Sequence, residues 1–151
     1  MTIRAATRAS ALALVVGVTA CSLPRWPVEG PMVEPFGIRW NGIVPDVHRG
    51  VDIRVDTGTS VRAISSGHVR FSGTMGDYGL VVWIDHGGEV LSVYAHLSEL
   101  LVQEGQAVSG GEVVGLSGST GNATGPHLHF EVWRGGRQVD PVAMLGGRPG
   151  P

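Results

Sequence analysis

The chain has 151 residues, a formal net charge of -2 and 24 glycines, and all 11 of its basic residues are arginine. This length gives room for one domain with an ordinary core, and the absence of any run of arginines argues against nucleic acid as a partner. The glycine content is more than twice the usual ~7%, which favours turns and strands over long helices.

The first 20 residues differ in kind from the rest. Arg4 and Arg8 precede the apolar run "ALALVVGVTA", and no acidic residue interrupts this segment. A basic start followed by a short apolar run and small residues is typical of a secretory signal, and the run is shorter than the ~20 apolar residues of a spanning helix. We therefore expect residues 1–20 to be a signal peptide that is removed on export.

Cys21, the only cysteine, follows this run directly. A single cysteine cannot form a disulfide within the chain, and a buried thiol is the plain alternative. The stretch "VTAC" resembles a bacterial lipobox, which implies that Cys21 becomes a lipidated first residue and anchors the protein to a membrane of the cell envelope. Residues 21–31, with Pro24 and Pro27, are then predicted to be a short spacer between anchor and domain.

Short apolar runs separated by glycines follow from residue 32 to residue 145. The clearest are "VDIRV", "VRAI", "HVRFSG", "GLVVWID", "EVLSVYAHL", "EVVGLSG" and "HLHFEVW". They predict a compact all-β domain of antiparallel strands. Only "LSELLVQEG" suggests a helical turn, with Ser98 as its cap, and residues 146–151 are expected to be a disordered tail.

The sequence contains a weak internal repeat. Residues 58–73 and residues 105–118 share a glycine, a valine three positions later, a second glycine, and an apolar strand that ends in Ser-Gly. This repeat predicts two similar β-hairpin units that pack together.

Two segments in the first two thirds of the chain carry candidate chemical groups. "HRGVD" supplies His48 and Asp52, but four residues of straight strand span ~13 Å, so Gly50 must permit a bend if both side chains bind one ion. In "SVYAHLS", alternation predicts that Tyr94 and His96 share a polar face and that His96 is free to point into a site.

The segment "GPHLHF" places His127 and His129 two residues apart, so on a strand both lie on one face while Leu128 and Phe130 enter the core. Two imidazoles and a carboxylate, with a fourth position left open, make up a catalytic zinc site. The chain supplies this set with histidines to spare. Spacing alone does not say which histidine binds a metal and which acts beside it.

The remaining candidates carry less chemistry. His68 and His86 each lie beside a tight turn and are predicted to be structural or exposed. The segments "GDYG" and "GSTG" lack the strand-to-helix context that a nucleophile elbow or a phosphate loop needs.

"HRGVD", "YAHL" and "STGNATGPHLHFEV" occur in this order, with "GTSVRAISSG", "IDHG" and "EGQAVSGGEVVGLSG" between them. Together they resemble the lysostaphin-type, or LytM-type, zinc metalloendopeptidases over residues 36–145. The resemblance implies the family's compact β fold, which is related to the barrel-sandwich of carrier domains. It implies one Zn²⁺ bound by His48, Asp52 and His129, and a catalytic pair, His96 and His127, beside the metal.

The family typically cleaves peptide cross-links of bacterial peptidoglycan, which implies that this protein acts on that substrate in the cell envelope. Tyr94 and Thr124 are candidate substrate-binding residues. Envelope regulators are further candidate partners. A second reading is a non-catalytic relative that binds and activates a cell-wall amidase. Such regulators typically lose metal ligands, whereas this chain keeps all of them. A biotinyl or lipoyl carrier, which "EGQAVSGGEVVG" also resembles, is excluded because the chain has no lysine.

Overall fold

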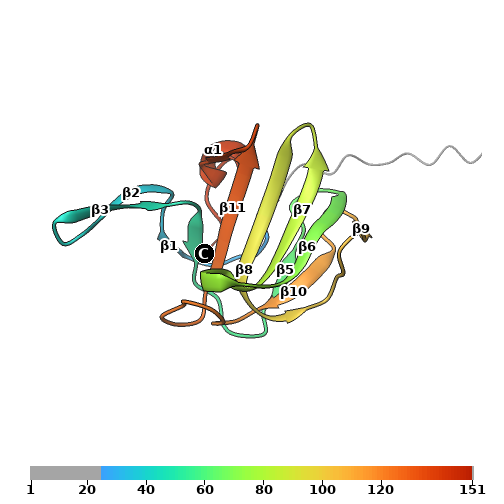
Figure 1. Cartoon of the computed structure of the whole chain (residues 1–151), viewed down its shortest axis with the longest axis horizontal. Coiled ribbons are helices and arrows are strands. Elements are labelled where there is room, and N and C mark those ends of the chain that lie inside the picture. The colour runs from blue at the N-terminus through green and yellow to red at the C-terminus, as the bar shows by residue number, and fades with distance from the viewer. Residues whose placement is uncertain (1–24, 151) are drawn as a thin grey trace, which may run out of the picture.

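The computed structural model describes residues 25–150, so the predicted signal peptide and Cys21 lie outside the described residues. The described chain is almost entirely antiparallel β-structure, which confirms the predicted fold class (Figure 1). No helix within it is long and apolar enough to cross a membrane.

One curled sheet of ten strands forms the body of the described domain. Its main order is β1 (Met32–Glu34), β4 (Val51–Ile53), β11 (Leu128–Arg134), β8 (Val90–Leu100), β7 (Gly79–Gly87), β6 (Gly67–Met75) and β9 (Ala107–Val108). β10 (Val113–Ser117) pairs with β8 and with β5 (Ser60–Arg62), and β12 (Arg137–Val139) pairs with β11. A 3-10 turn, η1 (Gly76–Tyr78), links β6 to β7.

Alternation along β11 separates the core from a second face of the sheet. Leu128, Phe130 and Val132 are fully buried in the main core, together with Val51 and Ile53 of β4. The residues between them point to the opposite face, because successive side chains of a strand alternate. This second face carries the polar groups described below.

The internal repeat corresponds to two similar units, but neither unit is a hairpin. β5 pairs with β10 and β6 pairs with β9, so the strands of each unit pair with strands of the other unit. The backbone bonds repeat as well: Gly111 and Glu112 exchange hydrogen bonds with Ala63 as Gly105 and Gln106 do with Val69. The repeat therefore closes one shared core, to which both units contribute buried valines.

Two segments predicted to lie outside the domain pack against it over their described residues. Trp26 makes an edge contact with Phe130, with ring centroids 6.2 Å apart, and the Arg25 N–H donates to the Ile64 carbonyl. At the other end, the Gly150 carbonyl accepts a hydrogen bond from Gly30 at 3.0 Å, and Pro149 is buried. The structure thus differs from the expectation of a free spacer and a disordered tail, because apolar side chains and backbone bonds tie both segments down.

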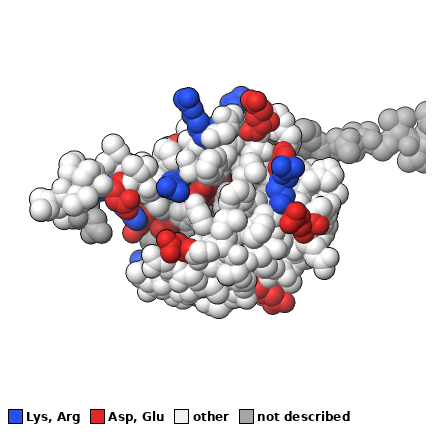
Figure 2. Space-filling view, in the orientation of Figure 1, with Lys and Arg blue, Asp and Glu red and all other residues white. Residues whose placement is uncertain are grey.

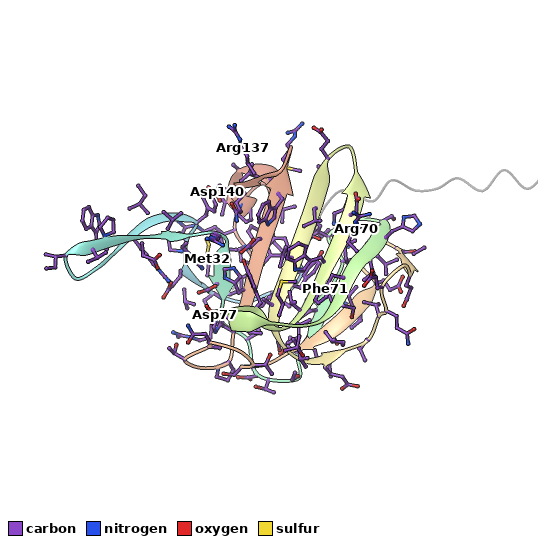
Figure 3. All side chains as sticks on the ribbon, viewed as in Figure 1. Met32, Arg70, Phe71, Asp77, Arg137 and Asp140 are labelled. Carbon is purple, nitrogen blue, oxygen red and sulfur yellow. The ribbon has the colours of Figure 1, made fainter. Side chains whose placement is uncertain are left out.

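The helical turn expected at "LSELLVQEG" is also absent, because β8 continues through this segment to Leu100. The α-helix in the described residues is α1 (Pro141–Leu145), which the Asp140 carboxylate caps by accepting a hydrogen bond from Val142 N–H at 2.9 Å (Figure 3).

A two-stranded arm, β2 (Gly37–Asn41) and β3 (Val44–His48), projects from the body (Figure 1). Its register pairs Ile38 with Val47 and Trp40 with Pro45, which puts four apolar residues on one exposed face. Charged side chains gather near the base of the arm and leave its end uncharged (Figure 2). Because β3 ends at His48, the arm leads directly into the site.

Candidate metal centre

Three side chains from three strands converge at the base of the arm. His48 Nε2 lies 3.1 Å from Asp52 Oδ1 and 3.2 Å from His129 Nδ1, and His129 Nδ1 lies 2.7 Å from Asp52 Oδ1. The three residues form the group in the described chain that could hold a metal ion. These three atoms form a small triangle with two nitrogens and one oxygen at its corners.

The triangle fits zinc. A tetrahedral zinc ion with bonds of ~2.0–2.1 Å needs ligand atoms about 3.3 Å apart, and the observed edges of 2.7–3.2 Å require only a slight expansion. The donor set of two imidazoles and one carboxylate matches that of catalytic zinc sites, which keep a fourth position for water or substrate.

Close approach of strands, and not an unusual backbone conformation, brings His48 and Asp52 together. His48 ends β3 and Asp52 lies in β4, so the chain turns between them, while Asp52 pairs in register with His129 of β11. Gly50 is not among the residues with positive φ. A Cβ at Gly50 would lie 2.3 Å from the Phe130 carbonyl oxygen, so glycine is required there for the strand contact.

Hydrogen bonds to the outer nitrogens orient the two histidines of the triangle. His48 Nδ1 donates to the Pro35 carbonyl at 2.8 Å, which leaves Nε2 free for a metal. His129 Nε2 lies 3.0 Å from Glu131 Oε1, and Glu131 is only 1% exposed. Sequence reasoning missed Glu131, although its position two residues after His129 on a strand places it on the same face.

His96 and His127 lie next to the triangle. His96 Nδ1 donates to the Thr120 carbonyl at 2.8 Å and His127 Nδ1 to the Gly125 carbonyl at 2.9 Å, so both Nε2 atoms remain free. The two ring centroids are 4.7 Å apart, and His127 Nε2 is 3.9 Å from Asp52 Oδ2. The structure therefore brings all five predicted metal-binding and catalytic candidates into one cluster.

The backbone of His96 has a left-handed conformation, with φ of 60°. Leu97 pairs with Leu80 while Tyr94 pairs with Val82, so β8 holds one extra residue here and forms a β-bulge. The bulge turns His96 onto the face that carries His129. A non-glycine residue in this region costs free energy, and such residues are often found at functional sites.

The same bulge explains why the prediction for Tyr94 fails. Tyr94 is fully buried in the main core, where its hydroxyl accepts a hydrogen bond from Ile64 N–H at 3.1 Å and bonds Ser92 Oγ at 2.8 Å. It therefore does not lie beside His96 at the metal site. His86 Nε2 extends this chain by bonding Ser92 Oγ at 2.7 Å, a structural role, while His68 is exposed.

Thr124, the other candidate substrate-binding residue, lies near the metal site. It lines a hollow of about 550 Å³ that adjoins Asp52 and His127, together with Glu34 and Arg54.

Burial and close pairing shift the pKa values of the cluster. Burial tends to raise the pKa of Asp52, but hydrogen bonds from His129 and His48 outweigh it and hold this pKa well below its usual range. Burial tends to lower the pKa of His129, but Asp52 and Glu131 outweigh it and raise this pKa to about 9. The pKa of His96 is lowered by burial, only partly offset by Thr120, so His96 favours the neutral form that can accept a proton.

Comparisons with known proteins show the family of the chain. Residues 46–141 match the model of peptidase family M23. The chain is 46% identical over 113 residues to the DD-carboxypeptidase/endopeptidase Mpg of Neisseria meningitidis serogroup B, which covers 74% of this chain and 26% of Mpg. It is 36% identical over 128 residues to the murein hydrolase activator NlpD of Escherichia coli strain K12, which covers 84% of this chain and 32% of NlpD.

Among solved structures, the chain is similar to a zinc-containing peptidase from Vibrio cholerae, with a TM-score of 0.74 and 33% identity over 78% of this chain and 38% of that one. The chain spans about a quarter of the length of Mpg and about a third of the length of NlpD. The family model covers both the first ligand segment and the final histidine pair, and the chain belongs to peptidase family M23, the metallopeptidases of the lysostaphin and LytM type.

Proposed function

We propose that the protein is a zinc-dependent endopeptidase that hydrolyses peptide cross-links of peptidoglycan in the cell envelope. The observation that carries the proposal is the ligand triangle of His48, Asp52 and His129 with two further imidazoles directly beside it. Zinc held there would lower the pKa of a water ligand toward ~7 and polarise a carbonyl oxygen.

The neighbouring histidines would handle the proton. His96 and His127 each have Nδ1 fixed by a backbone carbonyl, so Nε2 is the nitrogen that can take up a proton from water or donate one to a leaving amine. A pair of imidazoles with ring centroids 4.7 Å apart suits one acceptor and one donor, because two positive rings at that distance would repel each other.

The predicted location of the protein in the cell envelope supports this substrate. The predicted signal peptide would direct export of the chain, and a lipid at Cys21 would hold the domain in the envelope, where peptidoglycan lies. Among the similar proteins, Mpg is a DD-carboxypeptidase/endopeptidase and NlpD is a murein hydrolase activator.

A second candidate is a non-catalytic regulator that binds and activates a cell-wall amidase, and the similarity to NlpD favours it. The complete ligand set argues for hydrolysis, because binding a partner protein does not require two imidazoles and a carboxylate within 3.2 Å of one another.

Digestion of defined, cross-linked peptidoglycan fragments would test the proposal. We expect the zinc-loaded chain to cut a peptide bond in the cross-link, identified by product masses, and His129→Ala to release nothing. If the wild-type chain releases no fragments but accelerates a purified amidase, the regulator is correct and the peptidase proposal fails.

A further inference from the structure

We propose that Glu131 is a positioning residue for the metal: by accepting the Nε2 proton of His129, it keeps Nδ1 as the nitrogen that faces Asp52 and His48. The proposal rests on the proposed metal function of this cluster. It assigns a role to a buried carboxylate that hydrogen-bonds to His129 but not to His48 or Asp52.

The choice of tautomer matters because a neutral imidazole carries one proton, on either nitrogen. His129 has Nδ1 2.7 Å from Asp52 Oδ1, inside the triangle, and Nε2 3.0 Å from Glu131 Oε1, outside it. A metal requires Nδ1 without a proton. With the proton on Nδ1 instead, His129 Nε2 and Glu131 Oε1 would be two acceptors in contact in a buried site, which is unfavourable.

Glu131 is itself held by two other donors. The Tyr78 hydroxyl donates to Oε1 at 2.8 Å, and Trp133 Nε1 donates to Oε2 at 2.7 Å. With His129, three N–H or O–H groups surround the carboxylate, which can accept from all three. His129, Glu131 and Trp133 are alternate residues of β11 on one face of the sheet, the face where Phe71 of β6 also lies (Figure 3).

This arrangement makes Glu131→Gln an informative substitution. If the amide oxygen faces His129 and Tyr78, the amide NH₂ meets Trp133 Nε1–H, and two donors face each other. If the amide is turned over, its oxygen accepts from Trp133, but its NH₂ then faces His129 Nε2 and favours a proton on Nδ1. Only the second orientation relieves the clash with Trp133, and it favours the tautomer that cannot bind the metal.

Trp133→Phe removes the donor that creates this conflict. In the double variant Glu131→Gln, Trp133→Phe, the amide oxygen can face His129 without a clash and restore the productive tautomer. A purely structural role of Glu131 makes the opposite prediction, because a second change in a buried network should then weaken the site further.

The test measures zinc affinity of the purified chain by competition with a chromophoric chelator, with thermal melting of the metal-free protein as a check on folding. We expect Glu131→Gln to weaken zinc binding by ~10–100-fold, the usual cost of losing a carboxylate behind a ligating histidine. Trp133→Phe alone should change it little, and the double variant should recover most of the loss. Affinity of Glu131→Gln within twofold of wild type, or a double variant no better than Glu131→Gln, would overturn the proposal.

Nitrogen NMR of the wild-type, zinc-loaded chain gives a test that needs no variant: His129 must carry its proton on Nε2, and a proton on Nδ1 would contradict the proposal. Both readouts are independent of peptide hydrolysis. A chain that shows the expected zinc affinities but cuts no peptide would refute the proposed peptidase and leave the role of Glu131 intact.

Discussion

Gly50→Ala should show how much the close contact between β4 and β11 contributes to zinc affinity, apart from the ligands themselves. The added Cβ would lie 2.3 Å from the Phe130 carbonyl oxygen and 2.9 Å from Glu131 Cγ, whereas real Cβ contacts below 3.0 Å essentially never occur. The obstacle at 2.3 Å is backbone, so β4 and β11 must move apart. A movement of about 0.7 Å is needed, and such overpacking costs ~1–3 kcal/mol of stability.

The same movement acts on the metal site. β4 carries Asp52 and β11 carries His129, and metal–ligand distances tolerate only about ±0.2 Å. We therefore expect zinc affinity to fall at least ~10-fold, along with the melting temperature, which should fall by roughly 3–12 °C for a domain of this size. Chelator competition and thermal melting measure the two effects.

Gly67→Ala is the matched control. A Cβ at Gly67 would lie 2.3 Å from the Asp85 carbonyl oxygen, a clash of the same size between β6 and β7, remote from the metal site. It should cost similar stability and leave zinc affinity unchanged. The reasoning would be refuted if Gly50→Ala kept wild-type affinity, or if both variants lost zinc equally.

Four further outcomes are expected. His129→Ala should lose bound zinc and turnover together, and full zinc occupancy by metal analysis would contradict its assignment as a ligand. His96→Ala should keep zinc but lose ~10²–10⁴ in kcat, the contribution of a general acid–base group, and unchanged turnover would remove His96 from the mechanism. Because burial lowers the pKa of His96, the acid limb of kcat/KM attributed to it should lie below its usual pKa of 6.5, and a limb above pH 6.5 would contradict this. Labelling with a radioactive fatty acid should mark the wild-type protein but not Cys21→Ser.

The fold class could be predicted because alternation is a local pattern, whereas the clustering of the site was expected only from the resemblance to the lysostaphin-type family and depends on contacts between distant segments. Alternation in "HLHFEV" placed Leu128 and Phe130 in the core, and both are fully buried. The same alternation puts Glu131 beside His129, but its importance depends on Tyr78, which comes from a distant turn. A sequence pattern does not reveal such a partner.

Where sequence reasoning failed, contacts between distant segments decided the structure. Tyr94 pairs with Phe130 and faces the core, and an extra residue in β8 at His96, seen in its register with β7, puts His96 on the other face. Trp26 packs against the core because its ring contacts the ring of Phe130, about a hundred residues later in the chain. By contrast, the short helix at Pro141 had a readable local signal, an aspartate followed by proline, which is a common helix start.

The position of β11 within the sheet also bears on when the protein can act. β11 lies between β4 and β8, so the last long strand of the chain fills a place between two strands that come earlier, and only the short β12 of this sheet follows it. A nascent or shortened polypeptide that ends before residue 128 exposes two unpaired strand edges and lacks His129. The three predicted metal ligands would therefore come together only after β11 has paired with both of its neighbours.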